Sequence, residues 1–183
     1  MPTTLERPKP GDYDPYYDRY ISLIPGNDVI TTLASQLPKT VALLSGRSEQ
    51  DGDLRYAPGK WGVKEALGHM IDTERIMSYR ALRIARNDRT PIEGFEQDDY
   101  VRDGPHAGIL LADLVEEFKT VRAATLALLR NLGPTDWTRR GTANAKDITV
   151  RAIAFVIAGH EVHHRQILEE RYFRTAPARA EIA

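Results

Sequence analysis

The segment from Ile153 to Leu168 limits the possible folds more than any other part of the chain. It contains three of the five histidines, His160, His163 and His164, among residues that favour a helix. On a helix, His160 and His164 lie one turn apart and project from the same face. That face also carries the apolar residues Ile153, Val156, Ile157, Ile167 and Leu168. The pattern therefore predicts that both imidazoles lie on the side of the helix that packs into a core.

Two histidines buried together are unfavourable unless each ring nitrogen finds a partner. A divalent metal satisfies both rings, because neutral imidazole is a good ligand for zinc, nickel, copper and iron. A pair of core histidines that hydrogen-bond to neighbouring groups is the alternative. The chain has no cysteine, so protein ligands to a metal would be histidines or carboxylates.

Length and charge exclude several classes of protein. A chain of 183 residues forms one domain with a substantial core. Its formal charge of -1 argues against a general nucleic-acid or anionic-membrane binder. No apolar run approaches the ~20 residues that cross a bilayer, and the proline-bearing N-terminus lacks the apolar region of a signal peptide. We therefore expect a cytoplasmic protein.

Four amphipathic segments predict an all-α fold, a four-helix bundle. The expected helices span residues 27–45, 62–86, 108–131 and 149–172. Pro38 lies inside the first, where a kink or a brief break is expected. The connection 87–105 is longer than most loops and favours a binding or lid role. No stretch alternates clearly enough to require a sheet.

The two ends of the chain are expected to differ from the bundle, which we place at residues 27–174. Residues 1–26 form an N-terminal extension whose aromatic part packs on the bundle through its tyrosines. These are Tyr13, Tyr16, Tyr17 and Tyr20. Residues 175–183 form a short flexible tail.

A third metal ligand is expected from another long helix. Mononuclear catalytic sites commonly use three protein ligands and leave one position open. His69 is the only histidine in the middle of a second predicted helix, whereas His106 lies in a connection and is the weaker candidate. His163 lies one residue before His164 and outside the one-turn spacing of His160 and His164, so it could face a metal together with His164 only awkwardly. Asp72, one turn from His69, is either an acceptor that orients a ligand or a solvated surface carboxylate.

The segment His160-Glu161-Val162-His163-His164 also matches the short zinc-protease pattern H-E-x-x-H. Glu161 would then be the general base. The longer protease pattern fails, because Ile167 stands where a glycine belongs and only 19 residues follow His164. The alternative for Glu161 is a carboxylate on the helix surface.

Two blocks of sequence together resemble the DinB-like superfamily, and within it the YfiT-type branch. The blocks are Ala57-Pro-Gly-Lys-Trp-Gly-Val-Lys-Glu-Ala-Leu-Gly-His69-Met-Ile-Asp72-Thr-Glu-Arg75 and Ala158-Gly-His160-Glu161-Val-His-His164-Arg-Gln-Ile167. The intervening segments 79–83 and 94–100 also fit that branch. The resemblance extends from about Tyr16 to Tyr172.

The resemblance implies an up-down-down-up bundle that forms a homodimer. It also implies one divalent metal on three histidines, which carry over to His69, His160 and His164. Zinc and nickel are favoured as the metal, and iron, manganese and copper are compatible with imidazole ligands.

Three functions are compatible with such a site. The first is a metal-dependent transferase that joins a low-molecular-weight thiol, such as bacillithiol, mycothiol or glutathione, to an electrophilic small-molecule substrate. The second is a metal-dependent hydrolase that uses a metal-bound water, with Glu161 or Asp72 as candidates for proton transfer. The third is a non-catalytic, stress-related metal-binding dimer. The sequence does not separate them.

Overall fold

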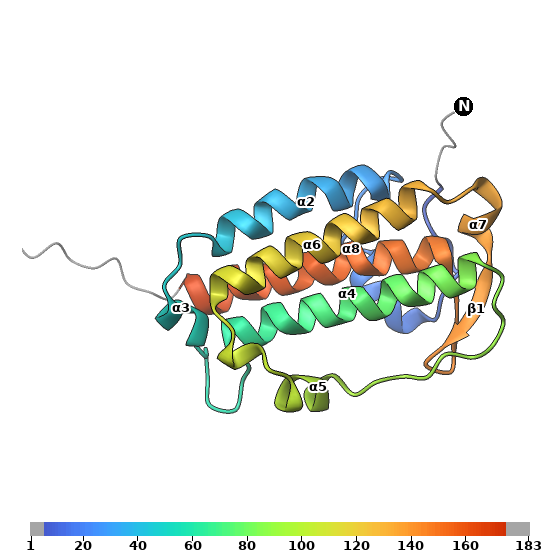
Figure 1. The fold of residues 1–183 in the computed structure, drawn as a ribbon. Coiled ribbons are helices and arrows are strands. Elements are labelled where there is room, and N and C mark those ends of the chain that lie inside the picture. The colour runs from blue at the N-terminus through green and yellow to red at the C-terminus, as the bar shows by residue number, and fades with distance from the viewer. Residues whose placement is uncertain (1–5, 175–183) are drawn as a thin grey trace, which may run out of the picture.

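Four long helices lie side by side along the molecule (Figure 1). They are α2 (Val29–Leu44), α4 (Val63–Ala85), α6 (Leu111–Arg130) and α8 (Val150–Ile167) of a computed structural model that describes residues 6–174. The colour gradient in Figure 1 shows that α2 and α8 run one way and that α4 and α6 run the other. Each of α4 and α2 packs against both α6 and α8. The predicted all-α bundle and its up-down-down-up order are confirmed.

The parallel direction of α4 and α6 explains the long connection between them. A chain that leaves the end of α4 must return along the whole bundle before it can start a parallel helix. Residues 86–110 make this return along the outside of the bundle (Figure 1) and include two short helices. These are α5 (Gln97–Asp103) and the 3-10 turn η2 (His106–Gly108).

The ends of the long helices follow their capping residues closely. The side chain of Asp28 accepts a hydrogen bond of 3.0 Å from the first turn of α2, and that of Thr149 accepts one of 3.2 Å at the start of α8. Gly62 precedes α4 without a capping side chain, and Glu65 accepts its N–H at 2.6 Å. The helix α2 continues through Pro38, so the brief break expected there does not occur. Beyond α8 the chain continues as a π-helical turn, η3 (Leu168–Phe173).

A β-hairpin forms in the connection between the third and fourth expected helices. The strands β1 (Arg140–Ala143) and β2 (Lys146–Thr149) pair antiparallel, so the expectation that no sheet forms was wrong in this segment. Asn144 and Ala145 join the strands, with φ of 52° and 56°. Two successive left-handed residues suit the right-handed twist of a hairpin. The usual sequence signal is Asn-Gly, and the Asn-Ala of this chain lacks it.

Short helices also lie in the connections between the expected helices. The helix α3 (Glu49–Asp53) starts at a capping box in which Ser48 and Asp51 exchange hydrogen bonds. The helix α7 (Pro134–Thr138) precedes the hairpin.

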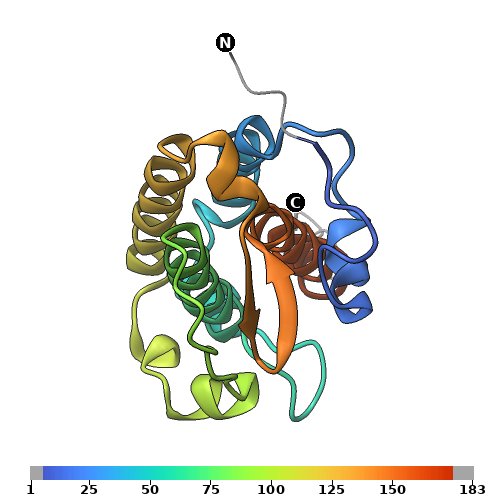
Figure 2. The same ribbon diagram turned by 90° about the vertical axis from the view of Figure 1, so that its right-hand side faces the viewer.

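The N-terminal segment, blue in Figure 2, lies against α8. It contains the 3-10 turn η1 (Pro15–Tyr17) and the helix α1 (Asp18–Ile21), which contacts α8. Tyr17 and Ile21 are buried. The tail expected at residues 175–183 lies outside the described residues, and the domain boundaries stay a prediction. No helix within residues 6–174 is long and apolar enough to cross a membrane.

The core of the bundle is divided by a layer of polar side chains. One apolar cluster contains the C-terminal parts of α4 and α6 with the N-terminal half of α8, and the other contains the N-terminal parts of α4 and α6 with residues of η3. The buried polar residues of the bundle interior include Gln36, Thr40, His69, Glu74, Arg122, Thr125, His160, Glu161 and His164. This layer contains the candidate site.

Gly159 permits the close approach of the N-terminal segment to α8, and its replacement by alanine should destabilise the protein. A Cβ at this position would overlap the backbone carbonyl of Tyr20. Alanine favours a helix by about 1 kcal/mol over glycine, but a backbone overlap in a packed core costs about 1–3 kcal/mol. We expect urea unfolding to show a net loss of stability. Gly108→Ala is the control, because nothing lies within 4 Å of its added Cβ. Equal or higher stability of Gly159→Ala would contradict the packing described.

Candidate metal centre

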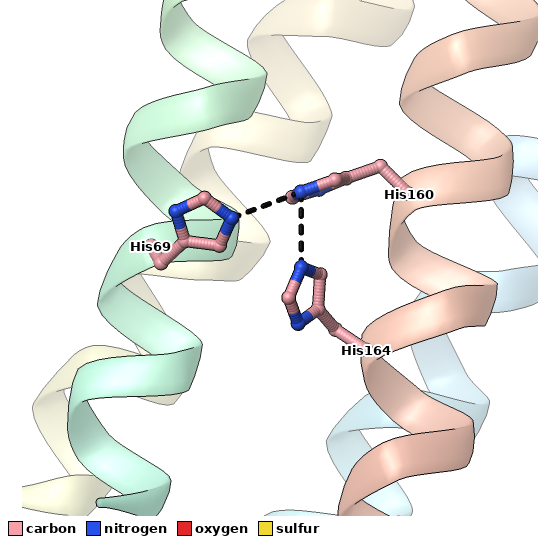
Figure 3. Close-up of side chains that lie close together, drawn as sticks. All are labelled: His69, His160 and His164. Carbon is pink, nitrogen blue, oxygen red and sulfur yellow. Dashed lines mark hydrogen bonds between the residues drawn. The ribbon is translucent and has the colours of Figure 1, made fainter. Parts of the chain in front are cut away.

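Three buried histidines meet between α4 and α8 (Figure 3). His69 comes from α4, and His160 and His164 come from successive turns of α8. The Nε2 atom of His160 lies 3.0 Å from Nε2 of His69 and 3.1 Å from Nε2 of His164. The structure thus brings together the three histidines that the sequence pointed to.

The chemical state of these rings suits a metal. Burial is the main cause that lowers the pKa of each of the three histidines, and the neighbouring histidines lower it further. For His69 the pKa falls to about 4, so the rings are neutral near pH 7. Nε2 of His160 faces both other Nε2 atoms, and a single ring nitrogen can serve two neighbours only by sharing its lone pair or proton. A divalent ion among the three nitrogens would accept all three lone pairs, so the donor set fits such an ion.

Aromatic rings surround the three histidines. The ring of Trp61 lies 4.8 Å from that of His69, and the ring of Tyr20 lies 5.4 Å from that of His160, measured between centroids. The hydroxyl of Tyr172 donates a hydrogen bond of 2.6 Å to the backbone carbonyl of Trp61. The two rings thus pack against His69 and His160, and the hydrogen bond of Tyr172 fixes the backbone of Trp61.

The other candidates from the sequence lie outside the cluster. His163 is half-buried, with its ring 5.1 Å from that of His164. His106 is buried against the backbone of Gly68, and its Nε2 lies 3.5 Å from a carboxylate oxygen of Asp72. Asp72 is therefore placed to orient His106.

Glu161 belongs to a buried ion-pair network next to the histidines. Its carboxylate lies 2.6 Å from Nη1 of Arg122 and accepts a 2.6 Å hydrogen bond from Thr40. Arg122 also donates two 2.8 Å hydrogen bonds to Glu74. Glu161 is only 2% exposed, so the surface carboxylate considered for it is wrong.

This network carries a formal charge of -1, from two carboxylates and one guanidinium. Burial opposes the charge on Arg122, but the hydrogen bonds and charges of Glu74 and Glu161 raise its pKa above the ordinary value. A net negative charge beside His160 would favour a cation held by the three imidazoles. Because one oxygen of Glu161 accepts the hydrogen bond from Thr40 and the other forms the ion pair with Arg122, its position suits charge balance better than proton transfer.

Cavities reach the histidines from two directions. The tyrosine-side cavity has a volume of about 270 Å³, and the tryptophan-side cavity one of about 510 Å³. The first is lined by Tyr16, Tyr17, Tyr20, His69, Arg80 and His160, among others. The second is lined by Tyr56, Lys60, Trp61, Arg102, His164 and Tyr172, among others. Asp98 of α5 lines both, so the long connection forms part of each wall.

Sequence reasoning missed two buried arginines of this region, although the pattern contained a signal for both. Arg122 follows Phe118 by four residues and Arg80 follows Met77 by three, so each lies on the apolar face of its helix. A charged residue at such a position is rarely buried without a partner. That rule would have predicted an ion pair or a ligand at each place.

Comparisons with known proteins agree with the fold. A search of curated proteins found no match. Among solved structures, YfiT from Bacillus subtilis superposes on this chain with a TM-score of 0.67 and 17% sequence identity. The superposition covers 92% of this chain and 93% of YfiT. YfiT is described as a probable metal-dependent hydrolase with an unusual four-helix bundle topology. The mycothiol-dependent maleylpyruvate isomerase superposes with a TM-score of 0.65 at 11% identity, over 79% of this chain and 61% of that chain.

This chain thus spans less than two thirds of the isomerase, and at such identities both likenesses show the fold alone. The family model of the DinB superfamily matches residues 32–168, which include all three clustered histidines. The chain belongs to the DinB superfamily.

Proposed function

We propose that His69, His160 and His164 hold one divalent metal ion and that the protein is a metal-dependent enzyme. The observation that carries this proposal is the convergence of three neutral, buried Nε2 atoms, two pairs of which lie 3.0 and 3.1 Å apart. Zinc and nickel are the first candidates, and iron, manganese and copper also accept imidazole ligands. Bound there, the ion would supply an electrophilic centre that favours the thiolate form of a bound thiol.

The reaction we propose is the transfer of a low-molecular-weight thiol to an electrophilic substrate. Two cavities support it, because a transferase must hold two small molecules whereas a hydrolase holds one and water. His69 and His160 line the smaller cavity and His164 lines the larger. The larger, tryptophan-side cavity suits the thiol, and the tyrosine-side cavity suits the electrophile.

The residues of the chain contribute position and exclusion of water. The rings of Trp61 and Tyr20 cover His69 and His160, so the two reactants would meet in a site of restricted solvent access. In the reaction we envisage, one sulfur–carbon bond forms. With an unsaturated substrate the thiol proton passes to the substrate atom that receives the electron pair, whereas with a halide such as monochlorobimane the carbon–halogen bond breaks and the halide ion and the proton leave.

Hydrolysis is the second candidate, and the likeness to YfiT, a probable metal-dependent hydrolase, favours it. It requires the same three histidines and only one of the cavities. A non-catalytic, stress-related metal-binding dimer is the third. The homodimer, the cytoplasmic location and the absence of nucleic-acid and membrane partners stay predictions.

An assay of free thiol separates these functions. Purified protein loaded with zinc or nickel is mixed with bacillithiol, mycothiol or glutathione and with electrophiles such as monochlorobimane. We expect loss of free thiol above the protein-free rate, abolished by a chelator and restored by the metal. Ester or amide cleavage without thiol, with the same dependence on metal, would support the hydrolase. If neither activity appears in metal-loaded protein, the non-catalytic alternative is favoured.

A further inference from the structure

Arg80 is a buried cation in the wall of the tyrosine-side cavity. It lies on α4 and is only 4% exposed. It follows His69 by eleven residues, which is close to three turns, so both side chains project from the same face of α4. The two positions are about 16 Å apart along the helix axis. The long Arg80 side chain turns back toward His69, since its Nη1 lies 3.5 Å from the sulfur of Met77, one turn earlier.

The protein provides hydrogen-bond partners for only some of the N–H groups of Arg80. Its Nη2 donates a 2.9 Å hydrogen bond to the backbone carbonyl of Glu93, and its Nε has no partner. Among residues 6–174, no carboxylate forms an ion pair with it. Arg122, which is also buried, has two carboxylates in contact. Burial without such a partner lowers the pKa of Arg80, whereas that of Arg122 is raised.

A guanidinium in this state has unused capacity for an anion. Arginine stays protonated at neutral pH, and a buried charge without a counterion is costly. Nη1 has no oxygen partner and Nη2 carries a second N–H beside its bond to Glu93, so the end of the planar guanidinium can match the two oxygens of a carboxylate. A ligand that supplied a carboxylate would therefore remove an existing cost as well as form hydrogen bonds.

The rest of the cavity suits a small, partly apolar ligand. Tyr17, Met77 and Val156 line it, and the ring of Phe95 lies 5.9 Å from Cζ of Arg80. Glu96 and Asp98 also line it, but both are exposed, so their charges are screened by solvent. A volume of about 270 Å³ lies below the usual range for drug-sized ligands.

We propose that the tyrosine-side cavity selects small organic acids, with the substrate carboxylate on Arg80 and the reacting carbon toward His69 and His160. This inference rests on the function proposed for the same site and names the chemical class of its second substrate. Arg80 would bind and position that substrate.

Binding measurements test the inference without turnover. Metal-loaded protein is titrated by calorimetry with aliphatic and aryl monocarboxylates such as cinnamate, each paired with its primary amide. In the wild type we expect the best acid to bind about 10- to 100-fold more tightly than its amide, as for a charge-assisted pair of hydrogen bonds. Arg80→Gln should lose this preference. Arg75→Gln is the matched control, since Arg75 lies on the same helix, is half-exposed and lines neither cavity.

Several results would overturn the inference. An equal affinity for acids and amides in the wild type would do so, as would a preference for acids that persists in Arg80→Gln, because the metal would then hold the carboxylate. If Arg80→Gln does not fold, Arg80→Lys replaces it, and this variant should keep the charge but lose most of the preference. A preference that depends on Arg80 in a protein without thiol transfer would uphold the substrate class and reject the transferase. Thiol transfer that occurs with neutral electrophiles only and does not depend on Arg80 would uphold the transferase and reject the substrate class.

Discussion

Replacement of His160 by alanine should remove the divalent metal from the purified protein. His160 is the central ligand of the proposed site, because its Nε2 lies within 3.1 Å of the Nε2 atoms of both His69 and His164. Without it only two imidazoles remain, one from each helix, and two ligands hold an ion less firmly than three. We expect metal affinity to fall by more than about 100-fold, beyond the 10–100-fold that loss of an outer hydrogen-bond partner costs. Elemental analysis of wild type and variant measures this directly.

His163→Ala is the matched control for this experiment. It removes an imidazole from the same helix turn, but one that is half-buried and outside the cluster. Metal should also raise the melting temperature of the wild type and of His163→Ala, because a ligand at 100 times its Kd stabilises a fold by about 2.7 kcal/mol. His160→Ala should show no such rise. Stoichiometric metal retained in His160→Ala would refute the proposed site.

Replacement of Arg122 by methionine should destabilise the protein more than any substitution on the surface. The Arg122 side chain is fully buried and bridges Glu74 of α4 and Glu161 of α8, and it also donates a 2.9 Å hydrogen bond to the carbonyl of Leu33 in α2. It thereby links α6 to the other three long helices. Its removal leaves two carboxylates buried without a counterion, which costs about 3–5 kcal/mol. For a chain of this length the melting temperature should fall by about 6–20 °C.

Two further variants make this test specific. Arg130→Met is the control, because Arg130 lies on the same helix but is exposed. Glu74→Gln in the Arg122→Met background should recover part of the loss, since it removes one of the two unpaired charges, and a double-mutant cycle measures that coupling. A loss below about 1 kcal/mol for Arg122→Met, by urea unfolding, would show that the network contributes little to stability.

The long helices could be predicted from the sequence because their signals are local. Apolar residues at helical spacing, the capping side chains of Asp28 and Thr149, and the absence of strong strand patterns lie within single segments. The hairpin at residues 140–149 could not, because its two central residues adopt left-handed conformations without the usual glycine. Contacts with Tyr13 and Ile92, distant in the sequence, extend its pairing and help to hold it.

The candidate site, like the fold, could be predicted from the sequence only in part. One helical turn between His160 and His164 placed two imidazoles on one face, but the third, His69, depended on the resemblance and on its position in a second helix. Their convergence follows from the packing of α4 against α8. Glu161 shows the limit of local pattern, since its spacing next to His160 suggested a general base and the tertiary contacts with Arg122 and Thr40 engage its carboxylate.

By itself, then, the sequence determined the helical class, the approximate helix ends and the histidines worth considering, because periodicity and capping act over a few residues. Only the tertiary structure decided which buried charges have partners. Arg122 and Arg80 occupy similar positions on the apolar faces of their helices, yet one meets two carboxylates and the other faces a cavity. The partner of a buried charge comes from another helix or from a ligand, and neither is encoded in the residues beside it.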